Sequence, residues 1–165
     1  MYREIVTKAV IGKGKIEDSG DIVVKVDNAI SKVLGCWVIN HYYVSSFENN
    51  KPIVKGRYDL HIWYGFNNDT DTSIHKQTID YAHEFNVNVK DGEEISDSNE
   101  LSVNCVKYPT CGGLSLNDDG NIIVKVEKEL SLDVIGETKL KVQVSTNSDE
   151  WSNDLNSINV DYLNK

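Results

Sequence analysis

The chain has 165 residues, which is enough to bury a hydrophobic core without disulfides, either as one domain or as two small ones. Its 26 acidic and 17 basic residues give a formal net charge of -9, which repels nucleic acid and anionic membrane surfaces. The N-terminal segment is charged, and no segment has the apolar length of a signal peptide or a membrane span. We therefore expect no nucleic acid partner, no membrane insertion and residence in a cytoplasm.

Alternating apolar and polar residues predict β-strands along most of the chain. In chain order, these predicted strands cover residues 5–11, 22–26, 36–44, 54–64, 79–89, 101–106, 122–126 and 140–144. The clearest is 54–64, a half-buried strand with Val54, Tyr58, Leu60, Ile62 and Tyr64 on one face. Only residues 27–34 and 128–135 could form a helical turn. The pattern predicts an all-β fold, an antiparallel β-sandwich or a barrel-like arrangement, with little helix.

A short internal repeat suggests how the chain is organised. Residues 20–27 and 120–127 are identical at five of eight positions when the sequence is compared with itself at an offset of 100. We interpret this as two related β-units, a first unit at 1–95 and a second at 96–145 packed on it. Chance similarity between strands rich in Val, Ile and Lys is the alternative. Residues 146–165 read as a flexible polar tail.

No catalytic, cofactor or metal motif stands out in the sequence, and we expect the protein not to be an enzyme. The four histidines lack the spacing of a local zinc site, although His61 and His75 could face each other across a hairpin. Residues 67–71 resemble the start of a calcium loop, but the glycine and the glutamate that such a loop requires are missing. The three cysteines are an odd number without a close pair, which argues against a secreted disulfide framework.

Aromatic residues on the predicted strands are the strongest candidates for a functional surface. Exposed strand edges and aromatic side chains together provide unpaired backbone groups and apolar area for association with another chain. The interface candidates are Trp37, Tyr42, Tyr43, Trp63 and Tyr64. Core packing is the competing interpretation for each of them. A carbohydrate-binding β-domain without catalytic activity is the alternative function, since tryptophan and tyrosine rings also stack on sugars.

Five blocks of sequence resemble the outer spore coat protein E family, the coat morphogenetic proteins of endospore-forming bacteria. They are residues 2–14, 34–41, 58–64, 121–129 and 134–139, in the order that the family has them. The stretch from Tyr81 to Asn99 matches weakly. The long, strongly acidic C-terminal tail typical of the family is here a short tail with few acids.

The resemblance implies a structural, non-enzymatic protein that forms homo-oligomers and recruits other spore coat proteins. It would gather around the developing spore in the mother-cell cytoplasm and then become part of the spore outer coat. Coat exposure after lysis of the mother cell suggests a further hypothesis, in which Cys36, Cys105 and Cys111 form intermolecular cross-links. A reduced, buried Cys36 beside Trp37 is the alternative.

Overall fold

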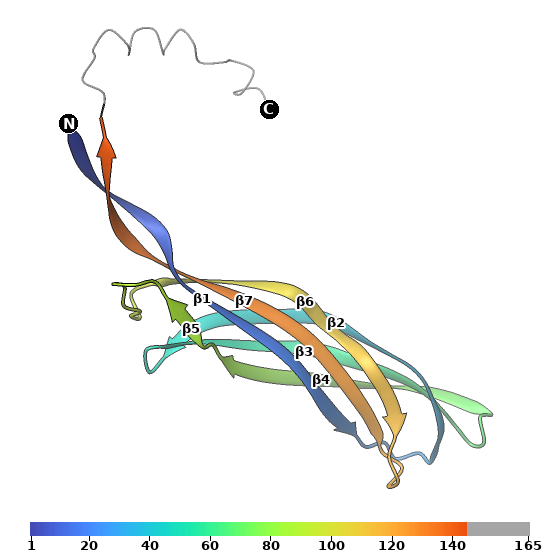
Figure 1. Ribbon diagram of the computed structural model, residues 1–165. Coiled ribbons are helices and arrows are strands. Elements are labelled where there is room, and N and C mark those ends of the chain that lie inside the picture. Colours follow the sequence, from blue (N-terminus) through green and yellow to red (C-terminus); the bar gives the residue numbers. More distant parts are fainter. Residues whose placement is uncertain (145–165) are drawn as a thin grey trace, which may run out of the picture. The chain divides into compact units, whose positions relative to one another are not determined.

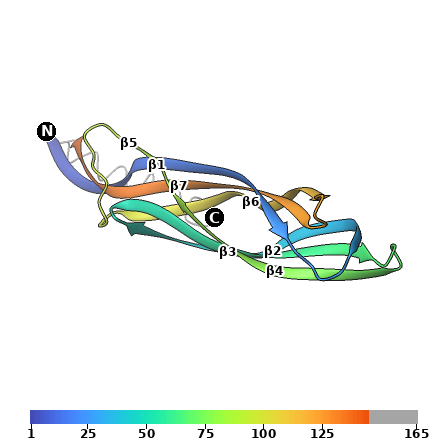
Figure 2. The same ribbon diagram turned by 90° about the horizontal axis from the view of Figure 1, so that it is seen from below.

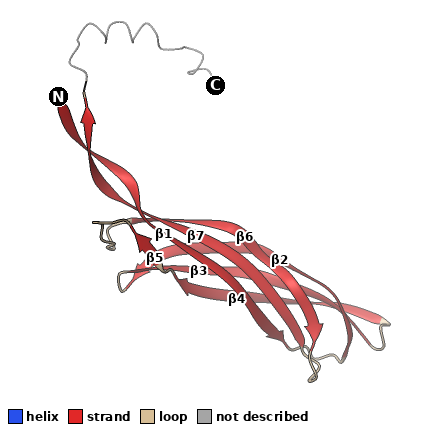
Figure 3. Ribbon diagram, viewed as in Figure 1, coloured by secondary structure: helices blue, strands red, loops and turns tan. Residues whose placement is uncertain are grey.

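The computed structural model describes residues 1–144, which form seven β-strands and no helix (Figures 1 and 3). The strands are β1 (Tyr2–Val24), β2 (Ile30–Glu48), β3 (Lys51–Phe66), β4 (Asp71–Glu84), β5 (Val87–Val89), β6 (Glu100–Leu116) and β7 (Ile122–Gln143). The predicted all-β class is confirmed. The tail predicted at 146–165 lies outside the described residues.

The two predicted helical turns are wrong. Residues 128–135 lie within β7, and most of 27–34 belongs to the start of β2. In β7 the apolar residues Leu130, Leu132 and Val134 recur at every second position and are all buried. This period of two fits a strand that packs one face on a core, and the packing outweighs the helical propensity of the lysine and glutamates nearby.

The chain divides into two compact units. The smaller unit contains Met1–Ala9 and the segment that begins at Glu137, and the larger one is Val10–Gly136. In the smaller unit the amide of Val144 donates a hydrogen bond of 2.9 Å to the carbonyl of Met1. An ion pair of 3.5 Å joins Lys139 to Glu4 across the same pair of strand ends. β1 and β7 therefore contribute one end each to this unit.

The larger unit is a β-sandwich, as predicted. One sheet has the strand order β5-β1-β7-β6, and the other has the order β2-β3-β4. Figure 2 shows the strands of the two sheets in separate layers. The four-stranded sheet takes strands from both sides of the sequence-predicted boundary near residue 95, so the sheets do not follow that division. The relatedness of the two predicted units stays a prediction.

The central strands β3 and β7 supply most of the core. Every second residue of each strand points inward, and the predicted half-buried strand at 54–64 is confirmed. The core forms two clusters, one around Leu60, Ile62 and Val124 and another around Val54 and Leu132. Between these clusters the inward positions are occupied by Gly56 on β3 and Lys128 on β7. A polar layer therefore interrupts the hydrophobic core.

Candidate association surface and buried polar layer

The outer face of the three-stranded sheet exposes large apolar side chains among its charged residues. Its outward positions carry large side chains that are between 39% and 64% exposed. We define the association face by these residues: Trp37, Ile39, Tyr42 and Val44 of β2, Trp63 of β3 and Ile74 of β4. Contiguous exposed apolar side chains on a folded domain indicate an interaction surface, whereas scattered ones do not.

The strand register brings the two tryptophans close to each other on this face. Trp37 lies opposite His61, with ring centroids 5.9 Å apart in an edge arrangement. Trp63 lies between Gly35 on β2 and Ile74 on β4. Gly35 has no side chain, and a Cβ added there would meet no non-neighbouring heavy atom within 4 Å among the described residues, so the face is open at this position.

A β-bulge in β2 determines which residues reach the association face. Asn40 has a φ of 57°, and the register shifts between Ile39 and Tyr42. Asparagine tolerates this left-handed conformation better than most residues, and the side-chain amide of Asn40 donates a hydrogen bond of 2.9 Å to Asp59. The extra residue turns His41 inward and keeps both Ile39 and Tyr42 on the outer face.

The outer face of the other sheet carries ion pairs between its strands. Lys15 of β1 pairs with Glu129 of β7 at 2.9 Å, and Lys107 of β6 pairs with Glu127 of β7 at 2.8 Å. The hydrogen bond from Lys107 holds the pKa of the Glu127 carboxyl below its usual range. Ion pairs therefore occur on both outer faces, since Arg57 pairs with Asp80 at 2.6 Å on the three-stranded sheet. The feature that distinguishes the association face is its two exposed tryptophans, a residue type enriched at protein interfaces.

Three of the five interface candidates from the sequence lie on the association face, namely Trp37, Tyr42 and Trp63. Tyr64 does not, because its inward position on β3 leaves the side chain only 4% exposed in the core. Tyr43 follows the bulge and also points inward, where its hydroxyl donates a hydrogen bond of 3.4 Å to the carbonyl of Val103. We remove both from the candidates.

Three aliphatic members of the face, Ile39, Val44 and Ile74, are absent from the candidates predicted from the sequence. The signal was present in part, since Ile39 follows Trp37 at the strand period. The position of Val44 depends on the bulge, and that of Ile74 on pairing between β3 and β4. Neither relation is visible in the local pattern.

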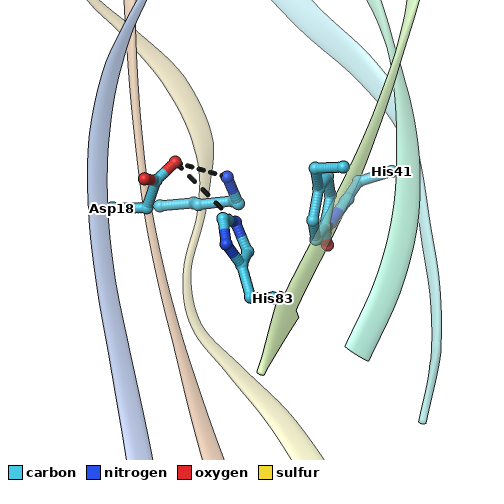
Figure 4. Close-up of polar contacts among 5 residues, drawn as sticks. Asp18, His41 and His83 are labelled. Carbon is cyan, nitrogen blue, oxygen red and sulfur yellow. Dashed lines mark hydrogen bonds and ion pairs between the residues drawn. The ribbon is translucent and has the colours of Figure 1, made fainter. Parts of the chain in front are cut away.

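Five side chains form the polar layer between the sheets (Figure 4). They are Asp18 of β1, His41 of β2, Tyr81 and His83 of β4, and Lys128 of β7. The Lys128 ammonium donates a hydrogen bond of 2.6 Å to Asp18 and lies 4.3 Å from the centroid of the Tyr81 ring. The Tyr81 hydroxyl shares a hydrogen bond of 2.6 Å with His41. The layer thus ties both sheets together through charged and aromatic groups.

Lys128 is the buried charge of this layer, with only 5% of its side chain exposed. Asp18 is the carboxylate that compensates it, and it is partly open to solvent. The Nε2 atom of His83 is buried 3.9 Å from Asp18 and has no hydrogen-bond partner among residues 1–144. In the sequence, the only sign of this layer is a lysine at an inward position of the β7 alternation.

We expect the protein to lose stability in mild acid. Burial, together with the nearby Lys128 charge, lowers the pKa of both His41 and His83. The unfolded chain then binds more protons below the ordinary histidine pKa of about 6.5, so the free energy of unfolding falls as the pH drops through that value. Urea denaturation at pH 7.5 and pH 5.5 measures the change. Replacing His83 with asparagine should reduce the pH dependence, and an unchanged dependence would contradict this assignment.

All three cysteines are half-buried and lie at inward positions. Burial raises the pKa of Cys36 to about 12, with Cys111 beside it, and burial also raises the pKa of Cys105. A thiol with a raised pKa is a poor nucleophile, because the thiolate is the reactive form. Intermolecular cross-linking through Cys36, Cys105 and Cys111 stays a prediction.

The remaining polar motifs do not assemble into a site in the described part. His61 pairs with Lys76 on the outer face, whereas His75 pairs with Ile62 and points inward, so the predicted His61–His75 pair is wrong. Within residues 1–144, no group of three or more His, Cys, Asp or Glu side chains is placed to hold a metal ion. The same residues include no helix of the length and hydrophobicity needed to cross a membrane.

Comparison with known families adds what the geometry leaves open. A family model described as outer spore coat protein E (CotE) matches residues 1–164, which is nearly the whole chain. No curated protein and no solved structure matches the chain. The matched range includes both the sandwich and the association face.

Proposed function

Because the chain belongs to the outer spore coat protein E family, a family of spore outer coat proteins, we propose that it is a self-assembling scaffold on which other coat proteins are deposited. The resemblance that the sequence blocks indicated is thereby confirmed at the level of the family. The finer role, with formation of homo-oligomers, recruitment of partners and a first location in the mother-cell cytoplasm, is our proposal.

The observation that carries the proposal is the association face. A coat scaffold needs surfaces that bury apolar area, and this face exposes two tryptophans, a tyrosine and three aliphatic side chains on one sheet. Aromatic residues are enriched among those that dominate interface energies.

We expect Trp63→Ser to weaken self-association by at least about tenfold, since a central aromatic side chain often contributes more than 1.4 kcal/mol to an interface. Sedimentation velocity of the reduced protein over a wide concentration range measures this. Tyr2→Ser is the matched control, because Tyr2 is 69% exposed but belongs to the smaller unit. Equal association of both variants would contradict a role for the association face.

Sedimentation velocity together with a glycan-binding assay separates the scaffold from a sugar-binding module. A carbohydrate-binding domain would remain monomeric and would lose binding to a glycan when Trp37 or Trp63 is removed. Assembly that depends on Trp63 without glycan binding supports the scaffold.

A further inference from the structure

Strand β4 is a long and regular open edge. It lies at the end of the order β2-β3-β4, so β3 is its hydrogen-bonded neighbour within the sheet. Its 14 residues contain no glycine or proline and pair with β3 without a register shift, unlike those of β2. A straight edge of this length presents a row of backbone N–H and C=O groups that can pair with another strand.

The outward side chains of β4 have a self-complementary order. From one end to the other they are Thr72, Ile74, Lys76, Thr78, Asp80, Ala82 and Glu84. Around Thr78 the sequence is balanced, with a cation two residues before it and an anion two residues after it. Further out, an apolar residue stands on each side, Ile74 before and Ala82 after.

We propose that two copies of the chain pair through β4, antiparallel and about a twofold axis at Thr78. The inference rests on the proposed function, since it names one contact of the self-assembly. In this register Lys76 lies opposite Asp80 of the second copy, and the pair occurs twice. Ile74 then lies opposite Ala82 of the second copy, also twice. Directly opposite side chains of opposite charge stabilise an antiparallel pair.

Neighbouring registers lack this match. An axis at Gln77 would put Ile74 opposite Asp80, and an axis at Ile79 would put Ile74 opposite Glu84. Axes at Lys76 or Asp80 would place two like charges directly against each other, which destabilises a strand pair. A shift that breaks the alternation would bring the inner face of one copy beside the outer face of the other. Thr78 is therefore the favoured centre.

The charges on β4 are available for this contact. Lys76 has no ion-pair or hydrogen-bond partner among residues 1–144. Asp80 receives a hydrogen bond of 2.6 Å from Arg57 on one carboxylate oxygen, and its other oxygen remains for a second cation. A lysine on an edge strand usually discourages pairing, but in this register it meets an aspartate.

Pairing through β4 would join three strands from each copy into a six-stranded sheet, with both association faces on the same side. A twofold contact by itself stops at a dimer, because each copy uses the same surface. Growth beyond the dimer would then use the association face as a second, independent contact.

A mixing experiment tests the register. Lys76→Glu sets two carboxylates against each other at each facing pair, and Asp80→Lys sets two ammonium groups against each other, so each variant alone should dimerise roughly tenfold more weakly. In an equal mixture of the two variants, each facing pair of the heterodimer joins one carboxylate with one ammonium group, so mixing should restore dimerisation close to that of the wild type. The double variant Lys76→Glu/Asp80→Lys restores opposite charges at both facing pairs within one sequence and should also dimerise like the wild type.

Two controls accompany these variants. Lys125→Glu, an exposed change on β7 of the other sheet, should leave dimerisation unchanged. Circular dichroism of each variant checks that the β-structure is intact. Arg57 donates a hydrogen bond to Asp80, and both Asp80→Lys and the double variant remove this acceptor. The urea midpoints of these two variants should therefore be similar.

Cross-linking gives a second readout. Thr78→Cys should form a disulfide-linked dimer under mild oxidation with copper phenanthroline, because Thr78 is the outward residue that faces itself. Thr72→Cys on the same strand should not, since it faces Glu84.

If the wild type assembles but the double variant stays as weak as the single ones, this inference is overturned and the proposed function stands. If the wild type is monomeric at every concentration, both are overturned. Assembly lost only in Trp63→Ser would place the contact on the association face instead.

Discussion

Asp18→Asn should destabilise the protein by roughly 3 kcal/mol, at the low end of the range for breaking a buried ion pair, because Asp18 itself is partly exposed. The substitution leaves the Lys128 ammonium buried without a carboxylate. Its remaining neighbour is the face of the Tyr81 ring at 4.3 Å, which compensates the charge only in part. Urea denaturation monitored by tryptophan fluorescence measures the loss.

Lys128→Met should be nearly neutral by comparison, because it removes the buried charge and fills a similar volume, while Asp18 keeps access to water. The double variant Asp18→Asn/Lys128→Met should therefore be more stable than Asp18→Asn alone. Asp21→Asn, an exposed change further along β1, is the matched control. If Lys128→Met costs as much as Asp18→Asn, the lysine stabilises the fold by its charge, and our account of the layer is wrong.

Gly56→Ala should cost about 1–3 kcal/mol through overpacking. A Cβ at this position would lie 2.1 Å from Cζ of Tyr81 and 2.3 Å from its hydroxyl oxygen. Tyr81 would have to leave its place, and its hydrogen bond to His41 would be lost. The shift in the urea midpoint measures the effect.

Gly35→Ala is the matched control, because among the described residues no non-neighbouring heavy atom lies within 4 Å of the added Cβ. It should change stability little. Tyr81→Val should relieve the clash, so the cost of Gly56→Ala should be much smaller in that background. A cost that is the same with and without Tyr81 would mean that the tyrosine is not the obstacle.

The strand class and the core face could be predicted because they follow a local pattern. The alternation at 54–64 identifies the buried face of β3 from the sequence alone, and the same alternation runs through 128–135, where a helical turn was predicted. Strand length was underestimated, since glycine and charged residues interrupt the apolar run of β1 although that strand extends from Tyr2 to Val24. Sheet pairing supplies hydrogen bonds to such residues whatever their side chains.

The functional surface could be predicted only in part, because it depends on relations between distant residues. Trp37 and Trp63 were found from composition, but the bulge at Asn40 decides that Tyr42 faces outward and Tyr43 inward. Tyr64 occupies an inward position in the alternation of β3, which places its side chain in the core. In the polar layer Asp18 and Lys128 are in contact although they are 110 positions apart in the sequence, and no local motif predicts such a contact.

The measurement that tests self-assembly most directly is the absolute mass of the purified, reduced protein by light scattering across a wide concentration range. Our account predicts that the mass rises with concentration, through a dimer and on to larger species, and that electron microscopy of the most concentrated sample shows ordered assemblies. A mass that stays at one chain, 18.6 kDa, at every concentration would contradict it.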